Sequence, residues 1–108
     1  MFARSVSIHV KPNRMREYRR VVENEAIPFL RRQRGFQDEL TLFMPGGSEV
    51  VEISLWDRRE DADVCSRSEF QGVFAALGDV IEGNSEVRIY AVSNSTFHKI
   101  AAPVFDRR

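Results

Sequence analysis

Several charged side chains in this sequence could move protons or stabilise a negative charge. His9 lies within an alternating segment over residues 5–10, and an imidazole with an ordinary pKa of about 6.5 can take a proton, such as a phenolic one, near neutral pH. Arg88 could stabilise an oxyanion on a bound substrate, and Glu52 could orient either of them. The alternative is that Glu52 and Arg88 form a structural ion pair, because an unpaired buried charge is costly, and that His9 only hydrogen-bonds a neighbour.

Three aromatic side chains could hold a flat ligand beside these groups. Trp56 is the only tryptophan, and it ends a strand-like segment just before Asp57, which can cap the start of a helix. Trp56 and Phe43 could sandwich an aromatic ring, and the Tyr90 hydroxyl could donate to a ligand oxygen. The alternative is that these rings fill a hydrophobic core or a subunit interface.

The composition argues against several classes of function. With 16 Lys and Arg against 16 Asp and Glu, the chain of 108 residues carries no net charge, which disfavours nucleic acid as the main partner. No apolar run approaches about 18 residues, so no membrane span is expected. The N-terminus does not resemble a signal peptide and a single cysteine cannot form an internal disulfide, so we expect a cytoplasmic protein. Metal-ligand, flavin and nicotinamide motifs are missing, so we expect no metal and no cofactor.

The hydrophobic periodicity predicts one domain of strands and helices. Strands are expected over residues 5–10, 36–44, 50–56 and 86–94, where apolar residues alternate. A long helix, kinked at Pro28 and ended by Gly35, follows the first strand, and helical segments over 58–66 and 68–82 precede the last. The order is βαββαβ, a ferredoxin-like α+β sandwich with an antiparallel four-stranded sheet. Residues 1–94 form this domain, and residues 95–108 form an apolar tail that could pack on a partner subunit.

One face of the predicted sheet combines polar and aromatic side chains. We expect the helices to cover the aliphatic sides of the strands, because helix packing supplies the core. The opposite face would then carry Ser5, Ser7, His9, Glu39, Thr41, Phe43, Glu52, Ser54, Trp56, Arg88, Tyr90 and Val92. Aromatic side chains exposed together usually mark an interface or a ligand groove. A second copy of the same sheet would cover them, so we expect a homodimer whose sheets enclose a mixed cavity.

Short motifs give the chain a resemblance to a known family. They are Val10-Lys11-Pro12, Arg34-Gly35-Phe36, Ile53-Ser54-Leu55-Trp56-Asp57, Ala62 and Phe70, within roughly residues 4–92. In these motifs the sequence resembles the antibiotic biosynthesis monooxygenase (ABM) group of dimeric α/β barrels. The resemblance implies the ferredoxin-like fold, a homodimer and a tryptophan that borders the pocket. Cys65 departs from the family, whose members often carry a histidine there, and the haem ligands of its haem-degrading members are missing.

The resemblance further implies a cofactor-independent monooxygenase that acts on an electron-rich phenol or hydroquinone, often polyketide-like. His9 would deprotonate the substrate, and Arg88 or Tyr90 would hold the oxyanion while the anion reduces O₂ directly. Barrels of this type also include isomerases and proteins with no known reaction. The alternatives are therefore a non-catalytic dimeric barrel that binds a small aromatic molecule, and an isomerase or quinone-handling enzyme.

Overall fold

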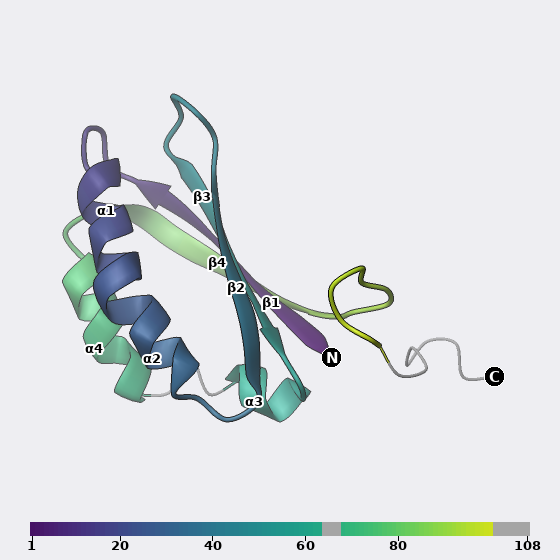
Figure 1. The fold of residues 1–108 in the computed structure, drawn as a ribbon. Helices are drawn as coiled ribbons and strands as arrows, with labels where there is room; N and C mark the ends of the chain where they lie inside the picture. The colour runs from purple at the N-terminus through teal and green to yellow at the C-terminus, as the bar shows by residue number, and fades with distance from the viewer. Residues whose placement is uncertain (64–67, 101–108) are drawn as a thin grey trace.

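The computed structural model describes residues 1–63 and 68–100 and contains the predicted order of strands and helices (Figure 1). The elements are β1 (Phe2–Val10), α1 (Met15–Val21), the π-helical turn η1 (Val22–Ala26), α2 (Ile27–Arg31), β2 (Phe36–Phe43), β3 (Glu49–Trp56), α3 (Arg59–Asp63), α4 (Ser68–Leu77) and β4 (Ile81–Ala91). The strands form one antiparallel sheet in the order β2-β3-β1-β4. The ferredoxin-like α+β fold is therefore confirmed.

The long helices cover one face of this sheet and leave the other, here called the open face, without a helical layer (Figure 1). The main hydrophobic core lies between the two layers and contains Val6, Ile8, Val10, Tyr18, Val22, Val50, Leu77 and Val80. Among the described residues, no helix is both long and apolar enough to cross a membrane. The predicted short helix over 58–66 corresponds to α3, and its last residues, with Cys65, lie outside the described part of the chain.

The predicted kink at Pro28 is a turn of π-helix. Proline has no backbone N–H, and its ring conflicts with the carbonyl four residues earlier in an α-helix. Just ahead of it, the Ile27 N–H donates to the Val22 carbonyl, five residues back, which widens the helix before the proline. The helix therefore continues through α2, and its buried residues fall at intervals of four: Tyr18, Val22, Ala26 and Leu30.

The last strand is longer than predicted. The predicted helical segment over 68–82 includes Ile81, but α4 ends at Leu77 and β4 begins at Ile81. An irregularity in the pairing of β1 with β4 between Ser7 and His9 lets the extra residues join the sheet. Ile81 then pairs with Val10 and packs on the main core, which explains its apolar character without a helix.

Strands β2 and β3 face the opposite way from the prediction. Residues directly opposed across an antiparallel pair point to the same side of the sheet. Glu52 lies opposite Val6 of β1, whose side chain is in the core, and Trp56 lies opposite Phe2. The polar and aromatic side of β3 therefore faces the helices. Because β2 pairs with this strand, Glu39, Thr41 and Phe43 face the helices as well.

The aliphatic sides of the same two strands lie on the open face. Alternation defines the two sides of a strand but not which of them is inward. The inward side of β3 buries Val50 and Trp56 completely, and its polar groups find hydrogen-bond partners, so the polar side can be the inner one. Leu40 and Leu42 are 54% and 48% exposed on the open face.

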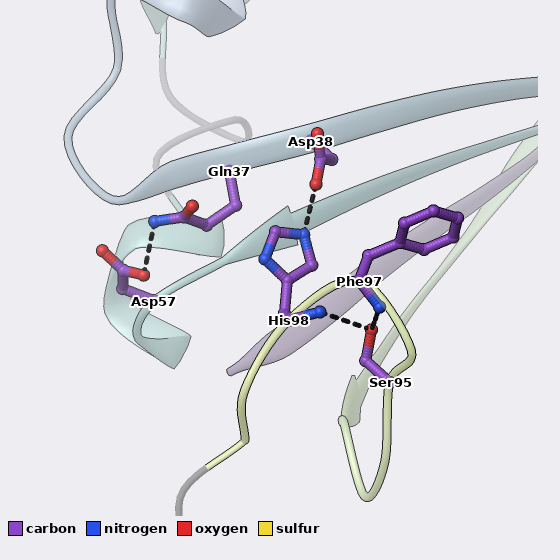
Figure 2. A network of polar contacts seen from close by, with 6 residues as sticks. All are labelled: Gln37, Asp38, Asp57, Ser95, Phe97 and His98. Carbon is purple, nitrogen blue, oxygen red and sulfur yellow. Dashed lines mark hydrogen bonds and ion pairs between the residues drawn. The ribbon is translucent and has the colours of Figure 1, made fainter.

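The described part of the tail connects the two edge strands of the sheet. The Val92 N–H donates to the Met1 carbonyl beside β4 (2.9 Å). The chain then forms a turn in which the backbone N–H groups of Phe97 and His98 donate to the Ser95 hydroxyl. His98 reaches Asp38 on β2, as Figure 2 shows, next to the hydrogen bond from Gln37 to Asp57. Residues 101–108 lie outside the described part, so the predicted packing of the tail on a partner subunit stays a prediction.

Gly35 joins α2 to β2 at a position that no other residue fits well. Its φ is +77°, and a Cβ placed there would lie 2.1 Å from Oδ2 of the buried Asp61. We expect Gly35→Ala to destabilise the domain by at least about 1 kcal/mol more than Gly46→Ala. Gly46 has a similar φ of +76° but open space around it, so its variant reports the backbone cost alone. Urea unfolding of both variants measures the difference, and equal losses would refute the steric conflict.

Candidate functional site

A cavity lies between the sheet and the helices. About 520 Å³ of its space is not filled by atoms, part of it open to solvent, and much of that space is narrow. Most of its wall is apolar and comes from β1, the long helix and α4: Val6, Ile8, Val22, Ala26, Leu30 and Leu77. The polar part of the described wall consists of Arg4, Tyr18, Glu39, Glu52 and Ser54. An apolar cavity with a few convergent polar groups has the character of a small-molecule site.

A chain of hydrogen bonds connects the polar groups of this wall. The Tyr18 hydroxyl donates to one carboxylate oxygen of Glu52 (2.5 Å), and the Thr41 hydroxyl contacts the other oxygen (2.5 Å). Thr41 also lies 2.9 and 3.0 Å from the two carboxylate oxygens of Glu39. Four side chains from α1, β2 and β3 thus form one polar network, here called the carboxylate network, whose members are Tyr18, Glu39, Thr41 and Glu52.

The geometry of Thr41 is best satisfied when the two carboxyl groups share one proton. A threonine hydroxyl has a single hydrogen to donate, and an ionised carboxylate can only accept. When Thr41 donates to one carboxylate, its contact with the other is a hydrogen bond only if that second carboxyl carries a proton. The arrangement is therefore satisfied by one carboxylate and one carboxylic acid.

The local electrostatics indicate which of the groups hold protons. Burial, followed by the charge of Glu52 and the hydrogen bond with it, raises the pKa of Glu39 to about 7. Burial and the neighbouring Glu52 also raise the pKa of Tyr18 above its ordinary value, so its hydroxyl stays protonated and acts as a donor. Glu39 is thus the group of the network that exchanges a proton near neutral pH.

Trp56 packs behind the described cavity wall and is not part of it. Its ring is completely buried, packs with Leu30 and Ala62, and meets the Phe36 ring edge-on at 5.4 Å. The indole N–H donates to the hydroxyl of Ser54 (2.8 Å), which lines the cavity. Trp56 is not among the described lining residues. The interpretation as a core residue therefore fits better than a ring that stacks on a ligand.

The other predicted site residues do not meet at one place. His9, Arg88 and Tyr90 lie on the open face, where Arg88 pairs with Glu86 instead of Glu52. Phe43 faces the helical side, but it lies at the end of β2, 45% exposed, with the Arg19 guanidinium 5.6 Å from its ring centroid. Only Glu52 of the predicted set lines the cavity. The expectation that these residues share one face is wrong.

Sequence reasoning did not assign a role to several groups that the structure brings together. Tyr18 lies within the predicted long helix, and nothing in the sequence gives its hydroxyl a separate role. The predicted first strand starts at residue 5 and leaves Arg4 out. In the structure β1 begins at Phe2, so Arg4 belongs to the strand and its side chain is buried. The alternation did put Glu39, Thr41 and Glu52 on one side of their strands, so their proximity was predictable. Only the direction in which that side faces was missing.

Within the described residues, no group of three or more His, Cys, Asp or Glu side chains could hold a metal ion. Every buried side-chain nitrogen or oxygen described has a hydrogen-bond partner. The described polar wall is therefore a satisfied network, and a ligand oxygen would have to share or replace its contacts.

No family model matches the sequence, and a search of curated proteins finds no match. Solved structures do match. SnoaB, a cofactor-independent oxygenase from Streptomyces nogalater, has a TM-score of 0.72 at 18% identity over 88% of this chain and 95% of that chain. The monooxygenase from the gene ActVA-Orf6 of Streptomyces coelicolor, in complex with nanaomycin D, has a TM-score of 0.74 at 14% identity over 91% and 92%.

A third matching structure belongs to a protein without an assigned function. NE2512, a protein of unknown function from Nitrosomonas europaea, has a TM-score of 0.72 at 14% identity over 94% of this chain and 94% of that chain. At these identities the likeness shows the fold alone. That fold is the one implied by the resemblance to the ABM group, and it includes oxygenases as well as a protein without an assigned reaction.

Proposed function

We propose that the chain is a cofactor-independent oxygenase that binds a phenol or hydroquinone in the cavity between the sheet and the helices. The observation that carries the proposal is the carboxylate network set into an otherwise apolar wall. The apolar part suits an aromatic ring in chemistry, provided that the lining side chains move apart to admit it, and the hydroxyl of the ring finds proton acceptors at the polar part. The oxygenases among the structures with this fold support the same choice of chemistry.

The reaction requires only the substrate and O₂. A phenol loses its proton, and the phenolate passes one electron to O₂, which gives a phenoxyl radical and superoxide. These combine into a peroxide at a ring carbon that carries hydrogen. Loss of water then breaks the O–O bond, so that one oxygen atom stays as the second carbonyl of a quinone and the other leaves as water. For phenol itself the balance is C₆H₆O + O₂ → C₆H₄O₂ + H₂O.

The protein would hold the planar anion, stabilise its charge and exclude bulk water. Arg4 is the cation in the wall and would favour the phenolate. The narrowness of the cavity favours a single ring, because a polycyclic, polyketide-like substrate would need the lining side chains to move further apart. His9, Arg88 and Tyr90 receive no role in this proposal, since they lie on the other face.

Oxygen consumption with a panel of phenols and hydroquinones, without added cofactor, tests the proposal. We expect O₂ uptake that depends on the protein, with single-ring substrates ahead of polycyclic ones. The second candidate is a binding protein for small aromatic molecules, which the same apolar wall with its satisfied polar network would also allow. Thermal stabilisation by the same compounds without O₂ uptake would replace the oxygenase by this binding function.

We also propose that the open face pairs with a second copy of the chain. It carries an apolar stripe made of Leu40, Leu42, Val51, Ile53 and Leu55, with Tyr90 (50% exposed) nearby on β4. An apolar patch on a sheet face usually marks an interface, and a two-fold axis would place the stripe against itself.

Leu42→Glu should separate such a dimer. It would place two carboxylates in the interface, and we expect the dimer dissociation constant to rise by about 100-fold or more, equivalent to about 2.7 kcal/mol. Gln71→Glu, on the exposed surface of α4, is the matched control and should leave the dimer intact. Light scattering across a concentration series measures both. A wild-type chain that is monomeric at micromolar concentration would contradict the proposal.

A further inference from the structure

Glu39 lies between two spaces. On one side it lines the cavity, and on the other it lines an outer groove between α2 and β2, together with Ile27, Arg31, Phe36, Gln37 and Asp38. It therefore touches the place where a ligand would bind and also has a route to solvent. Glu52, by contrast, lines only the cavity among these described pockets, and its two oxygens are engaged by Tyr18 and Thr41.

The contacts of the two carboxyl groups give them different roles. Glu52 accepts from the Tyr18 hydroxyl, a donor that keeps its proton, so its charged form is stabilised by at least one strong hydrogen bond. Glu39 accepts contacts from the Thr41 hydroxyl at both of its oxygens and also interacts with Glu52, with no tyrosine donor of its own among the described residues. Thr41 can donate to only one of the two carboxyl groups, and burial together with the neighbouring Glu52 raises the pKa of Glu39, so Glu39 is the group that gains or loses the exchangeable proton.

We propose that Glu39 is the general base of this site, which takes the proton of the bound phenol and later returns it to the oxygen atom that leaves as water. The inference rests on the proposed oxygenase function. In the first step the phenolic O–H bond breaks and a Glu39 O–H bond forms, with the electron pair left on the phenolate. When the O–O bond of the peroxide breaks, the C–H bond of the same ring carbon breaks too, and its electron pair forms the second carbonyl. The departing oxygen takes the proton of that C–H bond and the proton held by Glu39, and leaves as water. Glu39 is then ionised again, and no further proton donor is needed.

The surroundings of Glu39 suit this task. The charged and titratable groups that line the cavity or the groove with it are Glu52 from β3, Tyr18 from α1, Arg4 from β1, Arg31 from α2 and Asp38 beside it on β2. Burial, followed by the repulsion from Glu52, raises the proton affinity of Glu39 and brings its pKa to about 7, where a base is both ionised and strong enough to accept a proton. Because Glu39 reaches solvent through the outer groove, the ionisation of Glu39 before a substrate binds follows the pH of the solution.

Glu39→Gln tests the base directly. We expect turnover of a substrate phenol near pH 7 to fall by about 100-fold or more, since a general base contributes on the order of 10²–10⁴. In the wild type, turnover should rise with pH around a midpoint of about 7, because only ionised Glu39 accepts the proton. Glu86→Gln on the open face is the matched control and should keep the wild-type rate and profile. A Glu39→Gln variant with the wild-type rate and pH profile would overturn the proposal.

Glu52→Gln separates an electrostatic role from a structural one. A glutamine can accept from Tyr18 and donate to Thr41, so Thr41 is free to donate to an ionised Glu39. Loss of the Glu52 charge should therefore lower the pKa of Glu39 and move the midpoint of the pH profile down by about one unit or more. An unchanged midpoint in this variant would contradict the coupling between the two carboxyl groups.

A phenol whose absorption changes on ionisation tests the role of Glu39 as a base without any need for turnover. 4-Nitrophenol is the probe, and its phenolate band is recorded on binding near pH 7. The wild type should give more bound phenolate than Glu39→Gln, with similar affinity. If O₂ uptake fails while this difference is seen, the oxygenase function is wrong and the base stands. If the probe does not bind the wild type, or binds both proteins with equal ionisation, the base is wrong.

Discussion

Substitution of Ala26 by leucine should lower both the affinity for a phenol and its turnover by about 100-fold. Ala26 lies on η1, is buried, and lines the apolar part of the cavity. Leucine adds three carbon atoms to a space that is already narrow, and one methylene in such a pocket is worth roughly 1–3 kcal/mol of discrimination. Calorimetric titration with 4-nitrophenol and O₂ uptake measure the two losses.

The matched control is the same change on the other face of the sheet. Ala3 lies opposite Leu55 and Tyr90, on the open face, so Ala3→Leu should keep the binding of the phenol. Overpacking of the core costs about 1–3 kcal/mol, so urea unfolding must show that Ala26→Leu is still folded. If the site lay on the open face, the pattern would be reversed, and Ala3→Leu would lose binding while Ala26→Leu kept it.

Substitution of Trp56 by alanine is expected to destabilise the domain by about 3–5 kcal/mol, the usual cost of removing a large buried aromatic side chain. Trp56 is fully buried, its ring packs against Phe36, and its N–H holds the Ser54 hydroxyl at the cavity wall. The total stability of a small domain is about 5–15 kcal/mol, so the loss would leave little margin. Urea unfolding at constant temperature measures it.

Two further variants separate packing from a direct role in binding. Phe97 is 92% exposed, so Phe97→Ala should change stability by less than about 0.5 kcal/mol and serves as the control for loss of an aromatic ring. Trp56→Phe keeps most of the packing and removes the hydrogen bond to Ser54. It should still bind the phenol. A Trp56→Ala protein with unchanged stability and no binding would instead make Trp56 a ligand contact.

The fold could be predicted largely from local signals. Alternation in β1, the proline at position 28 and the glycine at position 35 each correspond to a feature of the structure. These signals act over a few residues, where sterics and hydrogen bonding decide the backbone. The end of α4 was missed because Ile81 suits a helix face as well as the first position of a strand.

The site could not be predicted from the same signals. Alternation grouped Glu39, Thr41 and Glu52 correctly on one side of their strands. The choice of which side faces inward relied on hydrophobicity, and both sides of β3 carry large apolar residues. Its polar side carries Trp56, while its aliphatic side carries Val51 and Ile53. Which side turns inward depends on the pairing of Glu52 with Val6 and on the Tyr18 hydroxyl supplied by a helix. Both are contacts between residues far apart in the sequence.

A crystal structure of the chain with a bound phenol, prepared without O₂ to prevent turnover, tests the central claim most directly. The account predicts the ring between the sheet and the helices, against Ala26 and Leu30, with its oxygen within hydrogen-bond distance of Glu39. A ring bound on the open face, beside His9, Arg88 and Tyr90, would contradict the account and restore the site expected from the sequence.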